Sequence, residues 1–183
     1  MKTILSGKSV LWPLAVGNSW TYRMNNGIKY SHKVISFNSS KPNEFLIKDT
    51  FWNKNYIIIK EGKEYKSNSQ NKETKIAVSN NKSTYLLKDD IRIGQNIGEH
   101  KYKIKGVNCV NIYIVKEIGI KKEVEGVIYN DVVVVEANLK MFMNGLTIPQ
   151  EYYTKYYYAK GVGLILTTST GGDYIPLISC QLN

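Results

Sequence analysis

The sequence predicts an all-β domain: one antiparallel, strongly curved sheet with little helix, folded as either a half-open barrel or a sandwich. Two observations carry this prediction. Apolar and aromatic residues alternate with polar residues in many short runs, and turns rich in Gly and Asn separate these runs. Helical periodicity is nearly absent, so strands account for most of the chain.

The predicted strands follow one another along the whole chain. Residues 19–24 and 27–37 form a hairpin around Asn25-Asn26-Gly27, because Asn and Gly tolerate the positive φ of a tight turn. The run Val132–Val135 is apolar on both faces, which predicts a central strand covered on both sides. Residues 63–88 are more polar and are expected at an edge or with one face in water. The other predicted strands are residues 44–52, 55–62, 63–69, 72–79, 83–88, 100–106, 109–119, 121–139, 151–169 and 173–182.

Two segments carry weak helix signals, and two others resemble each other. Residues 89–98 are too short and too broken by Gly for more than a turn, and residues 138–150 could hold a short helix or an apolar loop. Residues 14–20 (LAVGNSW) and 91–97 (IRIGQNI), here called the repeat segments, share the pattern apolar-x-apolar-Gly-amide-x-apolar. Each precedes a strand-rich stretch, which indicates two related halves.

The length of 183 residues fits a single domain over residues 1–183, with residues 1–10 as a flexible lead-in. A domain of this size buries roughly 70% of its unfolded surface, so it needs neither a disulfide nor a metal for stability. Cys109 and Cys180 both lie in apolar, strand-like surroundings. They are expected to be buried free thiols or, in an oxidising compartment, a single disulfide. The sequence implies no cofactor.

The formal net charge of +10 could indicate nucleic acid, an anionic membrane surface or an acidic partner. Arg23 and Arg92 are the only arginines, although arginine is the residue expected where phosphate is bound by a fork of donors. Spread-out lysines favour solvated strand faces over a nucleic-acid patch. The most lysine-rich stretch contains Lys48, Lys54, Lys60, Lys63, Lys66, Lys72, Lys75 and Lys82.

No stretch approaches the eighteen or so apolar residues of a membrane-spanning helix. The N-terminus is not a usable signal peptide, because Lys8 interrupts the apolar run and no small-residue cleavage site follows. We therefore expect either a cytoplasmic protein or one whose export signal has been removed. In the second case it would be extracytoplasmic, in the periplasm or anchored to the outer membrane.

Four segments, taken in order, resemble a poorly characterised group of bacterial exported and lipoprotein domains. They are the PLxVGNxWxY start at residues 13–22, "LLKDDIRIGQNIG" at 86–98, "VEGVIYNDVVVVE" at 124–136 and "YYAKGVGLI" at 157–165, followed by a closing strand at 174–182. The resemblance covers most of the chain and is weakest over residues 38–85. It implies an all-β domain outside the cytoplasm and no known catalytic residues. The curved sheet predicted from the strands is of the lipocalin or LolA type.

The sequence predicts no catalytic or metal site. His32 and His100 lie far apart in lysine-rich strands, and neither an HExxH motif nor a pair of cysteines at zinc-ligand spacing is present. No serine has the GxSxG context of a nucleophile elbow, and the carboxylates beside the mid-chain turn are of a kind that is usually solvated. We therefore expect a protein that is not an enzyme. The polar side chains to which this expectation applies are Ser19, Asp89, Asp90, Glu99 and Cys109.

Five aromatic residues are the candidates for ligand binding. Trp12 and Trp20 could line a pocket, although core packing is the alternative, with Trp12 capping an end of the core and Trp20 facing inward. In "EYYTKYYYAKG" Tyr156 shares one strand face with residues 152, 154 and 158, whereas Tyr153 and Tyr157 take the other face. These tyrosines either close the sheet or line an aromatic groove for a lipid, a glycan or a protein. The glycines at 161–163 permit a bulge or a close backbone approach.

The function predicted from these features is a non-catalytic binding module of the bacterial envelope. It would hold a lipophilic small molecule or a partner protein on a curved sheet, and its lysine-rich strands could also favour an anionic membrane surface. The alternative is a basic nucleic-acid-binding protein or an interaction protein of the inhibitor or immunity type, with nucleic acid the less favoured partner. The sequence does not fix an oligomeric state.

Overall fold

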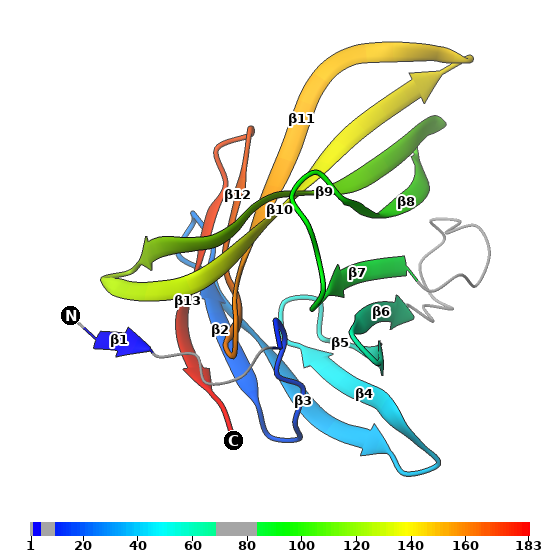
Figure 1. Cartoon of the computed structure of the whole chain (residues 1–183). Coiled ribbons are helices and arrows are strands. Elements are labelled where there is room, and N and C mark those ends of the chain that lie inside the picture. The colour runs from blue at the N-terminus through cyan, green and yellow to red at the C-terminus, as the bar shows by residue number, and fades with distance from the viewer. Residues whose placement is uncertain (1, 5–9, 69–83) are drawn as a thin grey trace.

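The structure is a computed structural model that describes residues 2–4, 10–68 and 84–183 (Figure 1). It confirms the all-β prediction, because the described residues form thirteen strands and no helix. Accordingly, no helix in this part of the chain could cross a membrane. The strands are β1 (Lys2–Ile4), β2 (Ser19–Arg23), β3 (Lys29–Asn38), β4 (Lys41–Asp49), β5 (Lys54–Glu61), β6 (Glu64–Asn68), β7 (Thr84–Lys88), β8 (Asn96–Ile104), β9 (Val107–Val124), β10 (Val127–Met143), β11 (Leu146–Ala159), β12 (Gly163–Ser169) and β13 (Tyr174–Gln181).

The sheet consists of two antiparallel meanders, β2 to β7 and β8 to β13, which join where β13 pairs with β2. It curls until it is nearly closed into a barrel, with β7 and β8 as its two end strands (Figure 1). Of the two predicted architectures, the barrel is therefore the one observed. Strand β1 pairs in parallel with the start of β10, within the segment that the sequence assigned to a lead-in.

The two repeat segments occupy equivalent positions at the start of the two meanders. The Gly17 amide donates to the Val34 carbonyl at 2.9 Å, and the Gly94 amide donates to the Val115 carbonyl at 2.8 Å. In both halves the valine amide returns a hydrogen bond to the residue after the glycine. Both glycines have positive φ, 94° and 80°, which suits glycine. The structure thus confirms the two related halves.

The core lies between the two meanders and is apolar. Val132–Val135 are at most 1% exposed in β10, which lies between β9 and β11, so the prediction of a central strand is confirmed. The two halves supply facing core residues, among them Val115, Val135, Tyr158 and Ile165 from one, and Tyr22, Val34, Ile47 and Ile58 from the other.

Residues 10–18 tie the two halves together at one end of the barrel. The Val10 carbonyl accepts a hydrogen bond from Gly161, in the turn before β12. The Leu11 amide donates to the Asp89 carboxylate at 2.6 Å, and the Tyr65 hydroxyl donates to the same carboxylate at 3.0 Å. Leu11 is fully buried, so this end of the barrel is filled by the chain itself.

Several predicted boundaries were wrong, and each error concerns a turn. Residues 138–150 are neither helix nor loop but the β10–β11 hairpin, which turns at Asn144-Gly145 with φ of 51° and 79°. The single stretch predicted at 121–139 contains the β9–β10 turn at Glu125-Gly126, which glutamate conceals because it seldom adopts positive φ. In the same way 151–169 is divided between β11 and β12, and residues 50–52 leave the strand predicted at 44–52.

Other predictions agree with the structure in part or lie outside it. In the first hairpin only Gly27 adopts positive φ, at 84°; neither Asn25 nor Asn26 does. Residues 89–98 contain no helix, and the predicted strand 72–79 lies outside the described residues. Both cysteines are free thiols, with Cys109 buried and Cys180 half-buried.

Candidate functional site

An open cleft of about 310 Å³ lies beside the β4–β5 turn. Its walls come from β3, the end of β4, the residue that follows β2 and the turn itself, and they are mostly aromatic. Concave sites with apolar walls and a few polar groups are the usual form of small-molecule sites. The lining residues are Met24, Tyr30, His32, Asp49, Phe51 and Trp52.

Strand register brings the polar pair of this cleft together. Tyr30 and His32 alternate on β3 and pair with Tyr22 and Trp20, which are buried on the inner face of the barrel. Asp49, the last residue of β4, lies directly opposite His32. Residues paired across an antiparallel ladder point to the same face, so these polar groups face inward beside the aromatic rings.

The same aspartate shapes the turn that carries the exposed aromatics. An oxygen of Asp49 accepts hydrogen bonds from the backbone amides of Phe51 (2.7 Å) and Trp52 (3.4 Å). Aspartate commonly initiates turns in this way. Asn53 completes the turn with φ of 49°. The carboxylate therefore fixes the position of both rings at the rim of the cleft.

Ring contacts continue from the rim into the barrel. The rings of Phe51 and Trp52 meet edge to face with centroids 4.8 Å apart, and Phe51 lies 5.6 Å from Tyr30. Tyr30 in turn lies 5.4 Å from Tyr22, which is buried. At the rim, the Trp52 side chain is left 67% exposed. An indole so open to water at the mouth of an aromatic cleft offers apolar surface to a ligand.

His32 and Asp49 form a half-buried pair. His32 Nε2 and Asp49 Oδ2 are 3.6 Å apart, and their side chains are 20% and 13% exposed. Burial lowers the pKa of His32, and the neighbouring carboxylate opposes this effect only in part. The imidazole is therefore neutral at pH 7 and can both donate and accept a hydrogen bond. In the part of the chain that the structure describes, no group of three or more His, Cys, Asp or Glu side chains could hold a metal ion.

Tyrosines of the opposite half face the cleft across the interior. Tyr156 and Tyr158 of β11 lie on the inner face, as the alternation predicts. Burial raises the pKa of Tyr156, and the nearby hydroxyls of Tyr113 and Tyr30 raise it further. The inner surface beyond the cleft is therefore lined by neutral phenols.

The five aromatic candidates from the sequence occupy three separate places. Trp12 and Trp20 contact each other at the end of the barrel filled by residues 10–18, with ring centroids 6.4 Å apart. Tyr156 faces the interior. Tyr153 and Tyr157 lie on the outer face, where the ammonium groups of Lys155 and Lys122 stand over their rings at 5.4 and 4.8 Å. The structure thus joins the two tryptophans but separates them from the tyrosines.

Sequence reasoning missed the residues of the cleft. A signal was present in "DTFW", where an aspartate that favours turns precedes two large aromatics. The sequence instead predicts a strand there, in which aromatic residues are ordinary.

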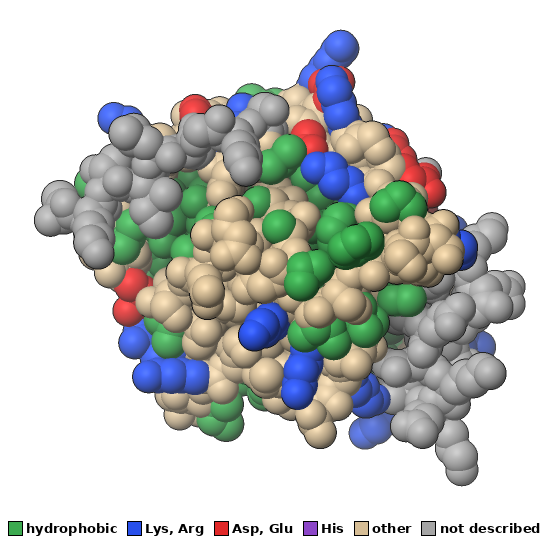
Figure 2. Space-filling model, turned by 90° about the horizontal axis from the view of Figure 1, so that it is seen from below, with side chains coloured by type: hydrophobic (Ala, Val, Ile, Leu, Met, Phe, Trp, Pro, Cys, Tyr) green, Lys and Arg blue, Asp and Glu red, His purple; other side chains and the backbone are tan. Residues whose placement is uncertain are grey.

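The lysines do not form one basic patch on the face that Figure 2 shows. Blue side chains there are spread among hydrophobic and neutral ones. Elsewhere lysines pair with carboxylates, as in the contacts of Lys63 with Asp90 (3.0 Å) and of Lys101 with Glu99 (3.6 Å). This arrangement is typical of solvated strand faces. Lys72, Lys75 and Lys82 lie outside the described residues.

No family model matches this chain, and no curated protein matches its sequence. Two solved structures are similar to it. One is a "putative exported protein with YmcC-like fold" from Bacteroides fragilis, with a TM-score of 0.57 and 10% identity over 93% of this chain and 98% of that one. The other is a "putative lipoprotein" from Parabacteroides distasonis, with a TM-score of 0.58 and 12% identity over 94% of this chain and 98% of that one. At these identities the likeness shows a shared fold.

Proposed function

We propose that this protein is a non-catalytic binding module of the bacterial cell envelope, and that it holds a lipophilic ligand in the cleft beside the β4–β5 turn. The observation that carries the proposal is the position of Trp52. Its ring is 67% exposed at the rim of an aromatic cleft of about 310 Å³. A ligand covering this ring would remove apolar surface from water, at roughly 25 cal/mol per Å².

The polar groups of the cleft define what kind of ligand would fit. Aromatic rings and the Met24 side chain suit an apolar body, whereas the neutral His32 and its partner Asp49 suit one hydrogen-bonding group. An amphipathic molecule with an apolar tail and a small polar head has both properties. The pair lies at one side of the cleft and would orient the head.

The envelope location is supported by the two solved structures with the same fold. Their printed names describe one as an exported protein and the other as a lipoprotein. A free Cys109 buried in the sheet is compatible with either side of the membrane, so the cysteines favour neither location.

A fluorescence titration with N-phenyl-1-naphthylamine, a neutral lipophile, tests the proposal. The full chain should increase the fluorescence of the probe in a saturable way. Trp52→Ala should weaken binding about tenfold, because the variant loses most of the apolar rim. Tyr174→Ala is the matched control, since it removes another exposed aromatic ring (44% exposed) that does not line the cleft.

Saturable binding that Trp52→Ala weakens and Tyr174→Ala leaves unchanged would support the cleft as the site. The absence of saturable binding, or equal loss in both variants, would overturn the proposal. A lyso-phospholipid should displace the probe, because it has the apolar tail and polar head that the cleft suits.

A further inference from the structure

The hairpins β8–β9 and β10–β11 extend together beyond the rest of the barrel (Figure 1). They are neighbours in the sheet, since β9 pairs with β10. Their turns, Lys105-Gly106 and Asn144-Gly145, are both two-residue turns with positive φ. We call the last residues of the two hairpins, 102–109 and 140–148, the projecting end.

The projecting end exposes large apolar side chains on one face. Leu146 is 75% exposed, Met143 53% and Ile104 50%. Met143 pairs with Leu146, and Ile104 pairs with Val107. Because Phe142 pairs with Asn108, the next residues along, Met143 and Val107, also lie side by side. The exposed side chains therefore form one continuous apolar row across four strands.

This row belongs to the inner face of the barrel. Two residues further from the turns, Tyr102, Cys109, Met141 and Ile148 occupy the same face. Within the barrel that face is buried by the opposite meander. At the projecting end nothing among the described residues covers it, so a row suited to burial is left in water.

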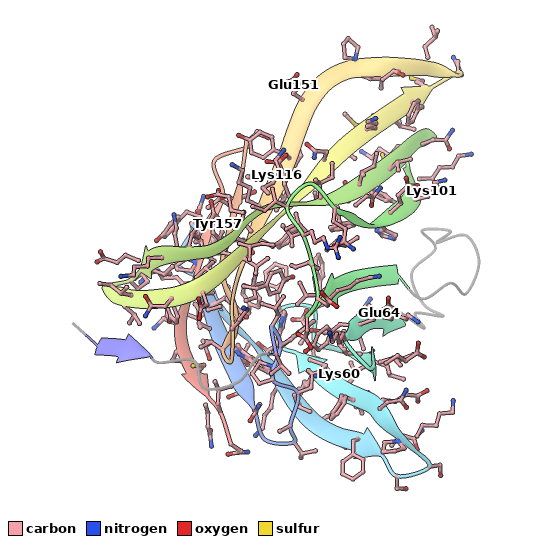
Figure 3. The ribbon with its side chains drawn as sticks, viewed as in Figure 1. Lys60, Glu64, Lys101, Lys116, Glu151 and Tyr157 are labelled. Carbon is pink, nitrogen blue, oxygen red and sulfur yellow. The ribbon has the colours of Figure 1, made fainter. Side chains whose placement is uncertain are left out.

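Positive charge lies beside the apolar row, in the β8–β9 turn and on the opposite face of the same hairpins. Lys103, Lys105 and Lys140 are exposed and form no ion pair with any described residue. Lys101 is paired loosely with Glu99 at 3.6 Å, and Glu151 on β11 is the other carboxylate of this region (Figure 3 labels Lys101 and Glu151). The unpaired groups at the tip are thus cationic.

We propose that the projecting end docks onto the surface of an anionic lipid bilayer. Ile104, Met143 and Leu146 would enter the interface, while the three unpaired lysines would contact lipid head groups. A stable protein interface needs about 800 Å² on each partner. A bilayer requires only a few apolar side chains supported by basic ones. The inference goes beyond the proposed ligand cleft and does not depend on it.

Co-sedimentation of the full chain with vesicles tests this proposal. Phosphatidylcholine vesicles containing phosphatidylglycerol should bind the protein, and vesicles of phosphatidylcholine alone should bind it much less. The double variant Met143→Asp/Leu146→Asp should weaken binding about tenfold, because it replaces inserted apolar groups with charges that the lipid repels. The variant Lys103→Gln/Lys105→Gln should weaken it about 25-fold, since each lysine near such a surface contributes about fivefold.

Two controls separate position from charge and from folding. Ile28→Asp places a charge at another exposed apolar residue (51% exposed), and Lys33→Gln/Lys48→Gln removes the same charge from exposed positions on β3 and β4. Both should bind like the unmodified protein. Equal binding by the tip variants and these controls, equal binding to both vesicle types, or self-association through the tip without vesicle binding would each overturn the proposal. Naphthylamine binding by Met143→Asp/Leu146→Asp should be unchanged, so failure here is distinguishable from failure of the cleft.

Discussion

The indole of Trp20 donates a hydrogen bond to the backbone carbonyl of Val162, with Nε1 and O 2.5 Å apart. The two residues are 142 positions apart, and this bond connects the first strand of one meander to the last turn before β12 in the other. Trp20 is only 1% exposed, so its single donor must find a partner within the protein. The neighbouring glycine makes this approach possible.

Gly163→Ala should destabilise the protein by about 2–4 kcal/mol. A Cβ at this position would lie 3.1 Å from Trp20 Nε1 and 3.4 Å from Trp12 Cδ1, and the backbone has φ of 105°. Gly172→Ala is the matched control, because its φ is 87° but a Cβ there meets nothing within 4 Å. The control should cost about 1–2 kcal/mol from backbone strain alone. Urea unfolding measures both, and equal losses would contradict the role assigned to the tryptophan contact.

Asp89→Ala should free residues 10–18 from the end of the barrel. The Asp89 side chain is 10% exposed and accepts hydrogen bonds from the Leu11 amide and the Tyr65 hydroxyl. Removing it leaves two buried donors without their acceptor, so we expect a loss of about 2–4 kcal/mol. Hydrogen exchange should report faster exchange at the Leu11 amide in particular.

Asp90→Ala is the control for this prediction. Asp90 follows directly in sequence, but its side chain is 68% exposed and, among the described residues, pairs with the exposed Lys63. Its loss should leave both stability and Leu11 exchange almost unchanged. If the two variants behave alike, the carboxylate of Asp89 does not hold the segment.

Asp49→Asn should lower the pKa of His32 further below its usual value. Burial already lowers this pKa, and the Asp49 carboxylate is what opposes the effect. An asparagine oxygen can still accept the turn amides, so the turn should persist. NMR titration of the two histidines measures the change. His100, whose pKa burial also lowers, should titrate as before in the variant.

The same pKa shift sets a pH dependence of stability. Because the folded-state pKa of His32 is below the unfolded value of about 6.5, the folded state binds its proton less readily. The stability that the folded protein gains from keeping His32 neutral is fully present above about pH 6.5. It is lost as the pH falls through the folded-state pKa of His32. Asp49→Asn should therefore be more sensitive to mild acid than the unmodified protein. An unchanged or raised pKa in the variant would contradict the assigned electrostatics.

The sequence alone determined the class of the fold and much of its local detail. Alternation identified most strands, and the all-apolar Val132–Val135 identified the central one, because a strand buried on both faces carries few polar residues. The repeat segments identified two halves, since Gly17 and Gly94 fill a backbone position that favours glycine in each. Each of these signals lies within a short stretch of sequence, so it can be interpreted without knowing which strands pair with one another.

Only the tertiary structure decided which surfaces become sites. Alternation states that Tyr156 and Tyr157 take opposite faces, but the curl of the whole sheet decides which of them is inside. His32 and Asp49 meet through the register of β3 and β4, which seventeen positions of sequence separation do not reveal. The β10–β11 hairpin was missed although Asn144-Gly145 is a strong turn signal, because exposed apolar residues on both sides hide the alternation that a solvated tip normally has. Which side chains are buried depends on how the whole sheet is assembled. The surfaces that stay exposed to a ligand or partner depend on it in the same way.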